Sequence, residues 1–484
     1  MHRAFMNPDR VRKFLNSRIV RYLFRWATSV DHQGQVRLEK ILLYYGKSKK
    51  GLSWMELLTF FWIYLAIEIL RILLRWKKEY LIREIFGPRN IRRATINLAR
   101  SVAEYGATQP QKFASPLLVV WNFTNACNLK CKHCYQDAGR KTRQLTLKER
   151  LMVIDELDRN FVPTLAFSGG EPLCDPELFE VASYAAKKEI YLSVATNGTL
   201  LSEDVCKRLR DCGVSYIEIS LESADPEFHD QFRGIPGLWK RTVTGIENAL
   251  KAGLLVGVAP TITRKNFSEL LRLYEFARSL GVHRFYVFNF IPTGRGKDIL
   301  QWDLSPEERE EMLDILYDCL MQKEIAVFST SPQFGRKCLE KNPEGLVITG
   351  HYSSAEGKLA RVGAEYVGGC GAGRAYCAFQ PDGTVTPCVF MPIAVGKLLE
   401  RPFKEIWDTS PVLVALRERS LFKGNCGVCD YRAVCGGCRA RAYAYFGDYL
   451  GPDPGCKFNA SYWQEIVRDS EKREINMQSV ASCK

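Results

Sequence analysis

Cysteine is absent from this 484-residue chain before Cys127, and acidic residues are scarce over the same stretch. Apart from one stretch, long apolar runs are missing, which excludes a many-pass membrane protein. A cleavable secretory signal is missing too, because Arg or Lys interrupts the first 30 residues every few positions. The hydrophobic content of 46% and the charged content of 25% are those of a globular protein and exclude wholesale disorder.

The net charge of +14 is confined to one end of the chain. Residues 1–115 hold 22 Lys and Arg against 8 Asp and Glu, whereas residues 116–484 hold 46 of each sign. A basic chain suggests a nucleic-acid partner. A basic segment of about a quarter of the chain instead indicates a separate extension. The length of the chain alone allows two to four domains at roughly 150 residues each.

The extension combines basic and apolar residues in patterns typical of helices. Residues 9–26 form one candidate helix, and Leu57–Leu74 is the single long apolar run. Eighteen residues is the lower limit for spanning a bilayer, and Glu68 and Arg71 make spanning costly. An interfacial helix is therefore favoured over a buried core helix or a true span. We expect a cytoplasmic protein that is peripherally associated with a membrane surface through residues 1–78, and a nucleic-acid partner is not favoured.

Strands and helices alternate from residue 116 at a spacing of about 30 residues, which is typical of parallel βαβ units. Six such strands predict an α/β fold with a partial (β/α)6 TIM-type barrel rather than an open doubly wound sheet. The expected strands are Leu117–Trp121, Thr164–Phe167, Ile190–Ala195, Tyr216–Leu221, Val256–Thr261 and Arg284–Phe290.

A first cysteine motif follows the first expected strand. Cys127, Cys131 and Cys134 are spaced as CxxxCxxC at the strand end where barrels place their active sites. Three thiolates can hold three irons of a [4Fe–4S] cluster and leave the fourth iron open. A zinc site is the alternative, but it needs a fourth ligand nearby, and the neighbouring His133 closes a tetrahedron awkwardly.

This motif resembles that of the radical S-adenosylmethionine (SAM) enzymes, and further strand ends match the same family. Residues 169–172 are similar to its GGEP motif, residues 195–198 to the next strand-end motif, and residues 292–296 to the PTGRG of one branch. The resemblance implies SAM contacts at Gly169, Gly170, Glu171, Asn197, Ser220, Glu222 and Arg233.

The family's chemistry is the reductive cleavage of SAM. An electron from the cluster breaks a sulfonium C–S bond, and the resulting 5′-deoxyadenosyl radical abstracts hydrogen from an unactivated C–H. The resemblance thus implies a low-potential electron donor such as ferredoxin or flavodoxin. The sequence identifies no side chain for proton transfer.

A second constellation holds eight cysteines near the C-terminus. Two zinc sites of four thiolates each would also fit the spacing. The pattern resembles the SPASM extension, a small cysteine-rich α+β domain with two auxiliary [4Fe–4S] clusters, although Gly436 and Gly437 shorten the last gap of its quartet by one residue. The resemblance implies three [4Fe–4S] clusters in all: the SAM-binding one, an inner one on Cys370, Cys377, Cys388 and Cys438, and an outer one on Cys426, Cys429, Cys435 and Cys456.

Five segments follow from these motifs. They are the helical extension 1–115, for a membrane surface or substrate delivery, the radical SAM core 116–320, a bridging segment 321–364, the SPASM domain 365–465 and a tail 466–484.

The substrate stays open at this level. A basic, apolar extension favours a membrane lipid whose hydrocarbon chain is activated for C–C bond formation, such as isoprenoid tail cross-linking. A peptide maturase of the RiPP type is an alternative, but it would bring a peptide-clasping fold with strands near the N-terminus. A haem, tetrapyrrole or other cofactor enzyme is a further alternative. A non-catalytic iron–sulfur carrier would not need Glu171 or Arg233.

Overall fold

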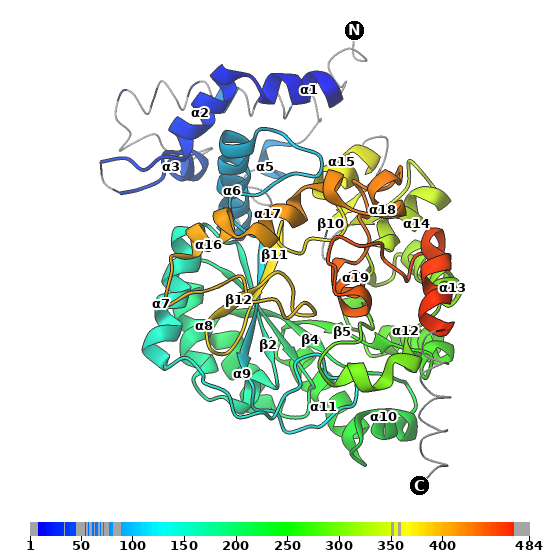
Figure 1. Ribbon diagram of the computed structural model, residues 1–484. Helices are drawn as coiled ribbons and strands as arrows, with labels where there is room; N and C mark the ends of the chain where they lie inside the picture. Colours follow the sequence, from blue (N-terminus) through cyan, green and yellow to red (C-terminus); the bar gives the residue numbers. More distant parts are fainter. Residues whose placement is uncertain are drawn as a thin grey trace.

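The structure is a computed structural model of the chain (Figure 1). It describes residues 8–32, 34–44, 77–80, 89–349, 353–356 and 360–468, together with Trp54, Leu57, Phe61, residues 63–65, Glu68 and Arg71.

A mostly parallel sheet forms the wall of a partial barrel. All six expected strands are present and neighbour one another in chain order, and the sheet continues with β8 at one side and with β11–β13 at the other. The parallel strands are β1 (Leu118–Thr124), β2 (Thr164–Gly169), β3 (Tyr191–Thr196), β4 (Val214–Ile219), β5 (Leu255–Val258), β6 (Thr261–Ile262), β7 (Arg284–Asn289), β8 (Ala326–Ser329) and β11 (Tyr376–Phe379), and β12 (Thr384–Thr386) and β13 (Gly396–Lys397) are antiparallel. The predicted α/β fold with a partial barrel is confirmed.

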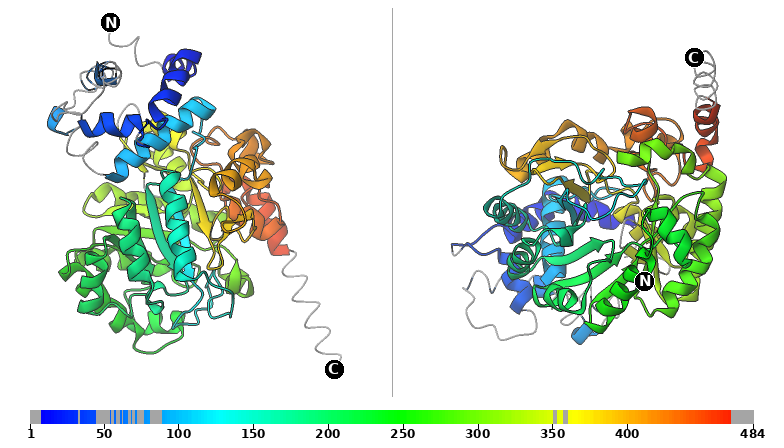
Figure 2. Two further views of the ribbon diagram at one scale, coloured as in Figure 1. Left: turned by 90° about the vertical axis from the view of Figure 1, so that its left-hand side faces the viewer. Right: turned by 90° about the horizontal axis from the view of Figure 1, so that it is seen from below.

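Helices cover the outer face of this sheet (Figures 1 and 2). Thr146 and Ser305 begin two of them with reciprocal capping boxes to Glu149 and Glu308. The helices are α7 (Leu147–Arg159), α8 (Leu178–Lys187), α9 (Glu203–Asp211), α10 (Pro226–Arg233), α11 (Leu238–Lys251), α12 (Leu270–Ser279), α13 (Pro306–Gln322) and α14 (Gln333–Lys341). Their apolar sides bury a core with the sheet that includes Trp121, Phe167 and Tyr274. This packing holds the strand ends in fixed positions.

The C-terminal cysteine-rich region packs against the barrel as short elements. The hairpin of β11 and β12 adds directly to β1, so this region and the barrel share one sheet. Its helices are α15 (Ala360–Val367), α16 (Phe403–Thr409), α17 (Pro411–Arg417), α18 (Asn425–Val428) and α19 (Arg439–Phe446). The expected bridging segment 321–364 is not a simple linker, because β8 pairs in parallel with β7 and a separate hairpin joins β9 (Val347–Thr349) to β10 (Ser353–Ala355).

The extension is helical where the structure describes it, with α1 (Pro8–Leu15), α2 (Arg18–Thr28), α3 (Arg37–Tyr44), α5 (Lys78–Tyr80) and α6 (Arg89–Tyr105). The single helix expected over residues 9–26 is two helices, because the Ser17 hydroxyl accepts a hydrogen bond from the Val20 N–H and caps α2. Helix α6 lies between the other extension helices and the barrel (Figures 1 and 2). Helix α6 thus connects the other extension helices to the barrel.

Arg93 fastens α6 to the barrel. Its guanidinium donates to the carbonyls of Leu157 and Asp158 in the last turn of α7, to that of Val162 just after α7, and to that of Lys188 just after α8. These carbonyls lie at helix C-termini, where a cation is favourable. They also precede β2 and β3, so α6 lies at the end of the barrel opposite the cysteine motif. Part of the basic excess therefore serves internal contacts rather than a partner.

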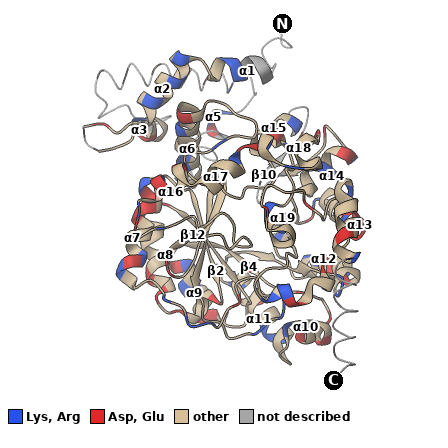
Figure 3. Ribbon diagram, viewed as in Figure 1, with Lys and Arg blue, Asp and Glu red and all other residues tan. Residues whose placement is uncertain are grey.

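The apolar run Leu57–Leu74 lies mostly outside the described residues. Within the part of the chain that is described, no helix is long and apolar enough to cross a bilayer. Figure 3 shows basic residues on α1 and α2, whereas both signs of charge mix over the helices around the barrel.

Candidate active site

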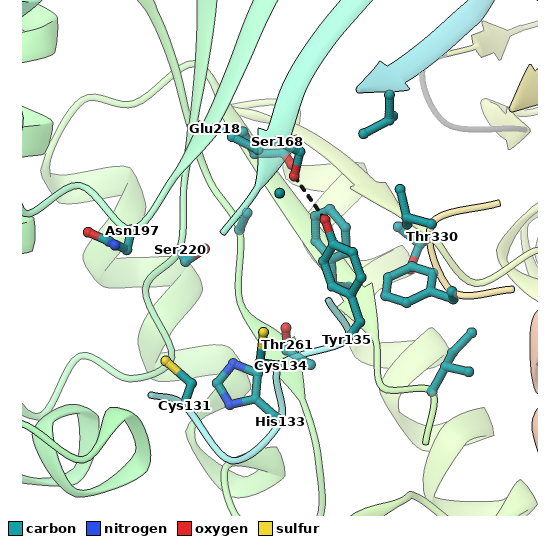
Figure 4. A pocket seen from close by; sticks show the side chains of 18 of the residues that line it. Cys131, His133, Cys134, Tyr135, Ser168, Asn197, Glu218, Ser220, Thr261 and Thr330 are labelled. Atoms are coloured by element: carbon teal, nitrogen blue, oxygen red, sulfur yellow. Dashed lines mark hydrogen bonds between the residues drawn. The ribbon is translucent and has the colours of Figure 1, made fainter. Parts of the chain in front are cut away.

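A cavity of about 200 Å³ opens among the carboxyl ends of the strands (Figure 4). Its wall includes the thiols of Cys127, Cys131 and Cys134, and Cys388 of the C-terminal region. The first cysteine motif and one thiol of the second constellation therefore border the same space.

The three thiols of the first motif lie together on the loop after β1. They share a small apolar cluster with Leu129 and Leu238. Burial raises the pKa of Cys127 to about 12, although the Leu129 N–H donates to its Sγ at 3.4 Å and favours the thiolate. A bound cation would compensate for the cost of ionising these thiols.

The PTGRG segment after β7 is hydrogen-bonded to this loop through Arg295. The Arg295 guanidinium donates to the carbonyl of Cys131 at 2.9 Å and to that of Ala138 at 2.8 Å, and the Arg295 N–H donates to the carbonyl of Cys134 at 3.0 Å. Gly294 has a φ of +57°, and a Cβ there would overlap the carbonyl oxygens of Cys134 and Tyr135. The motif therefore shapes the thiol-bearing loop, a role that the sequence did not reveal.

The two glycines of the GGEP motif line the cavity, but the glutamate does not. A Cβ on Gly170 would overlap the Ala126 carbonyl oxygen, so only glycine permits this approach. The Glu171 carboxylate is fully buried and accepts hydrogen bonds from the Thr196 hydroxyl at 2.7 Å and the Asn197 N–H at 2.8 Å. Glu171 thus ties the ends of β2 and β3 together behind the cavity wall.

Arg233 comes from α10 and reaches the cavity beside the thiol loop. It forms an ion pair with the buried Glu222, and its Nη1 lies 3.5 Å from the Cys131 Sγ. Glu222 also accepts the Thr261 N–H at 2.7 Å and does not line the cavity. Burial, then the charge of Arg233, lowers the pKa of His133 well below its ordinary value, so this cavity-lining imidazole is neutral.

Asn197 and Ser220 line the cavity at the ends of β3 and β4, as Figure 4 shows. The Asn197 Nδ2 donates to the Asn128 Oδ1 at 2.8 Å, which connects β3 to the thiol loop. The structure therefore brings five of the seven expected SAM residues to the cavity wall, namely Gly169, Gly170, Asn197, Ser220 and Arg233.

Tyr135, Ser168 and Asn289 are among the cavity residues that the sequence patterns did not assign to the site. The Tyr135 and Ser168 hydroxyls are hydrogen-bonded at 2.9 Å, and the Tyr135 ring packs on Phe390 with 5.0 Å between centroids (Figure 4). Asn289 at the end of β7 is 1% exposed; its Oδ1 accepts from Arg309, while its Nδ2 has no hydrogen-bond partner within the described chain. Tyr135 follows Cys134 and Ser168 precedes Gly169, whereas no motif adjoins Asn289.

The four expected outer thiols lie together. Burial raises the pKa of Cys429, Cys435 and Cys456, and in each case the charge of Cys426 raises it further. Backbone N–H groups point at three of the sulfurs: Asp453 at Cys426, Tyr431 at Cys429 and Gly437 at Cys435, at 3.3–3.4 Å.

Three of the four expected inner thiols also lie together, and one does not. Burial raises the pKa of Cys388 and Cys438, and the charge of Cys370 raises both further. These three share one apolar cluster. Cys377 belongs instead to the main barrel core, and Arg417 is the one charged group of the described chain that shifts its pKa.

The donor set suits iron–sulfur clusters. Within the described ranges, no three His, Cys, Asp or Glu side chains surround a point that one metal ion can occupy. A [4Fe–4S] cluster makes a different demand, because each thiolate binds its own iron and N–H donors to sulfur tune the cluster. The N–H···S contacts at Cys127, Cys426, Cys429 and Cys435 meet that demand.

Comparisons with known proteins agree with this geometry. The model of the radical SAM superfamily matches residues 121–277, and that of an iron–sulfur cluster-binding domain, SPASM, matches residues 370–439. An AdoMet-dependent heme synthase of Methanosarcina barkeri is 36% identical over 346 residues, which are 71% of this chain and 96% of that protein. A pre-heme d1 synthase of Dinoroseobacter shibae is 31% identical over 359 residues, 71% of this chain and 87% of that protein. The mycofactocin maturase MftC of Mycobacterium tuberculosis is 30% identical over 350 residues, 71% of this chain and 83% of that protein.

Solved structures share the fold. SuiB of Streptococcus suis bound to S-adenosylmethionine superposes with a TM-score of 0.62 at 16% identity, over 87% of this chain and 93% of that one. The enzyme anSMEcpe with bound AdoMet gives a TM-score of 0.55 at 20% identity, over 74% of this chain and 98% of that one. The fold and site define a barrel enzyme built around cysteine-ligated clusters. The chain belongs to the radical SAM superfamily and carries a SPASM domain, so its cofactors are SAM and [4Fe–4S] clusters and it requires a reductant.

Proposed function

We propose that this enzyme modifies a tetrapyrrole by radical SAM chemistry. Two of the relatives named above are a heme synthase and a pre-heme d1 synthase. The observation that carries the proposal is the match to a heme synthase along 96% of that protein. When bound and reduced, the cluster and SAM supply a 5′-deoxyadenosyl radical. Abstraction of hydrogen followed by loss of an electron from the substrate is a net oxidation, for which auxiliary clusters are suitable acceptors.

The composition of the cavity wall favours a flat, apolar substrate. Aromatic rings from several elements line it, and flat apolar ligands bind well between such rings. They belong to Tyr135, Tyr286, Phe288, Phe290, Tyr376 and Phe390. Asn289 lies at the same wall, and its buried Nδ2 has no hydrogen-bond partner within the described chain.

We assign the SAM subsite to the cavity-lining members of the expected set, Gly169, Gly170, Asn197, Ser220 and Arg233. Glu171 and Glu222 would act behind the wall, where the first holds the end of β3 and the second holds Arg233. The three thiols on the loop after β1 would hold the SAM-binding cluster.

The test is an anaerobic assay of the reconstituted full-length enzyme with SAM and an iron porphyrin that carries carboxylates, such as Fe-coproporphyrin III. We expect a porphyrin product of lower mass only when SAM is present, and more 5′-deoxyadenosine with the porphyrin than without it. Ferredoxin or flavodoxin, the electron donors that we propose, should replace dithionite. Formation of 5′-deoxyadenosine that no tetrapyrrole stimulates would count against the assignment.

Peptide modification is the second candidate, supported by the 30% identity to a mycofactocin maturase. A peptide-clasping fold would bring strands near the N-terminus. The described part of residues 8–105 holds helices and only an isolated bridge between Val30 and Val36. The same assay with a candidate precursor peptide in place of the porphyrin separates the two substrates.

A lipid substrate, the main expectation from the sequence, has no counterpart among the relatives named above, and isoprenoid cross-linking gains no support. Contact with a membrane surface is a separate proposal and rests on α2. Helix α2 packs on α6 through Ala27 and through Arg21, whose guanidinium donates to the Ala103 and Glu104 carbonyls, whereas Ile19, Tyr22 and Leu23 are 74%, 67% and 55% exposed. Apolar side chains beside basic ones are typical of interfacial helices.

Vesicle flotation tests this contact. The full chain should float with vesicles that contain anionic phospholipid, and the double variant Ile19→Ser/Leu23→Ser should not. Leu271→Ser on α12 is the matched control, because Leu271 is 51% exposed at another surface. Equal flotation of the double variant and the control would show that α2 is not the membrane-binding element.

A further inference from the structure

Cys377 lies on β11, and its neighbours in the sheet determine where its thiol points. Strand β11 is parallel to β1, with Tyr376 opposite Leu118 and Cys377 opposite Val119. Successive side chains on a strand point to opposite faces. Leu118 and Tyr376 both line the cavity, so Cys377 and Val119 point away from it.

The packing agrees with the register. Tyr376 shares an apolar cluster with Cys388, Cys438 and Cys370, which are the remaining expected inner ligands. Cys377 and Val119 are both completely buried in the main core on the other side of the sheet. The sheet itself therefore separates the Cys377 thiol from the other three.

We infer that the inner auxiliary cluster has only three protein thiolates, from Cys370, Cys388 and Cys438, and that its fourth iron is open to the cavity. Three thiolates leave one iron of a [4Fe–4S] cluster without a protein sulfur, as on the loop after β1. Two side chains beside these thiols could also bind the iron, and both already accept hydrogen bonds. The Tyr376 hydroxyl accepts the Val389 N–H at 3.0 Å, and the Asp453 carboxylate accepts the Cys438 N–H and the Gln333 Nε2 at 2.7 and 2.6 Å.

The cavity side of this cluster suits a ligand from the substrate. Cys388 and the two residues after it line the same cavity as the SAM-binding thiols. The described cavity wall includes two cationic residues, Arg233 and Arg295. Arg233 is paired with Glu222, and Arg295 is paired with Asp137. An anionic group of the substrate, such as a carboxylate, would therefore find its cation at the open iron. This inference uses the family assignment and not the identity of the substrate.

The first experiment concerns the ligands. Full-length protein is reconstituted anaerobically as wild type, Cys377→Ala, Cys377→Val and Cys388→Ala, and iron, sulfide and the electron paramagnetic resonance (EPR) spectrum after reduction are measured. Both Cys377 variants should keep the wild-type iron content and spectrum, whereas Cys388→Ala should lose iron or change the auxiliary signal. The valine variant fills the apolar site left by the thiol, so a folding defect in the alanine variant does not obscure the result. Loss of iron from a folded Cys377 variant would overturn the inference.

The second experiment concerns the open iron. The triple variant Cys127→Ala/Cys131→Ala/Cys134→Ala removes the SAM-binding cluster, so that any remaining open iron belongs to the SPASM domain. Cyanide labelled with ¹³C serves as the anionic probe and is read by electron–nuclear double resonance. Hyperfine coupling to ¹³C in the reduced auxiliary signal supports the open site. An auxiliary signal that cyanide leaves unchanged would contradict it, whatever the outcome of the porphyrin assay.

Discussion

Arg233 and Glu222 form a buried ion pair whose arginine also lies 3.5 Å from the Cys131 Sγ through Nη1. Burial lowers the pKa of Arg233, but the charges of Glu222 and Cys131 raise it, and the net shift of the pKa is upward. The carboxylate thus keeps a cation beside the thiol loop, where the carboxylate end of SAM would need one. The pair links β4, α10 and the thiol loop in one contact.

Arg233→Gln should lower the free energy of unfolding by about 3–5 kcal/mol, because it leaves Glu222 buried without its partner. Arg241→Gln on the exposed surface of α11 should change it by less than about 0.5 kcal/mol. Adding Glu222→Gln to Arg233→Gln should recover part of the loss, since no unpaired charge then remains. Denaturant titration of the anaerobic holoprotein gives the unfolding free energy of the wild type, the two single variants and the double variant. An unfolding free energy for Arg233→Gln equal to that of the control would show that the pair is not important for stability.

Gly294→Ala should reduce the occupancy of the SAM-binding cluster. Alanine at a positive φ costs about 1–2 kcal/mol anywhere, but at Gly294 its Cβ also meets the Cys134 and Tyr135 carbonyls and must displace the thiol loop. Gly281→Ala is the matched control, because Gly281 has a φ of +74° and no atom within 4 Å of an added Cβ. Iron content and the EPR signal that responds to SAM are the measurements. Equal losses in the two variants would mean that backbone strain, and not the close approach, is responsible.

The positions of the motifs along the chain were predictable because the fold is parallel. Carboxyl ends of parallel strands meet at one end of a barrel, so motifs after β1, β2, β3 and β4 had to converge. The structure accordingly brings Cys127, Gly170, Asn197 and Ser220 to one cavity. The bounds of the six expected strands were accurate to within a few residues, because the alternation of apolar strands with amphipathic segments is strong in this region.

The direction of individual side chains was not predictable from spacing. Cys377 lies at a plausible ligand spacing, but only its register with Val119 reveals that it points into the core. Glu171 lies in the expected motif, yet it bonds to Thr196 and Asn197 behind the cavity. The charge of the extension was equally ambiguous, since counting Arg93 as basic cannot reveal that it binds helix-end carbonyls. Because the basic residues of the extension were interpreted as facing a partner, the sequence analysis favoured a lipid substrate over a tetrapyrrole.

Asn289→Asp should impair the substrate step while leaving the fold intact. Aspartate keeps the size of the side chain and the acceptor for Arg309, but it replaces the unpaired, buried Nδ2 donor of this cavity-lining residue with an acceptor. Loss of one hydrogen bond to a bound substrate costs about 1–2 kcal/mol, which corresponds to roughly a 5- to 30-fold fall in kcat/KM for the modified substrate. Formation of 5′-deoxyadenosine without substrate should be unchanged. Wild-type kcat/KM in this variant would place the substrate away from Asn289.

Cys127→Ala should abolish 5′-deoxyadenosine formation and remove about a third of the iron, since one of three clusters loses a ligand. The auxiliary clusters should persist, because their thiols lie in separate apolar surroundings. Cys206→Ala is the matched control, because this thiol is completely buried on α9 within the barrel core, whereas Cys127 belongs to a separate apolar cluster. Iron analysis, EPR before and after reduction, and chromatography of the SAM cleavage products are read on the same samples. Continued 5′-deoxyadenosine formation by Cys127→Ala at the control's rate would show that radical generation does not depend on the thiols at the end of β1.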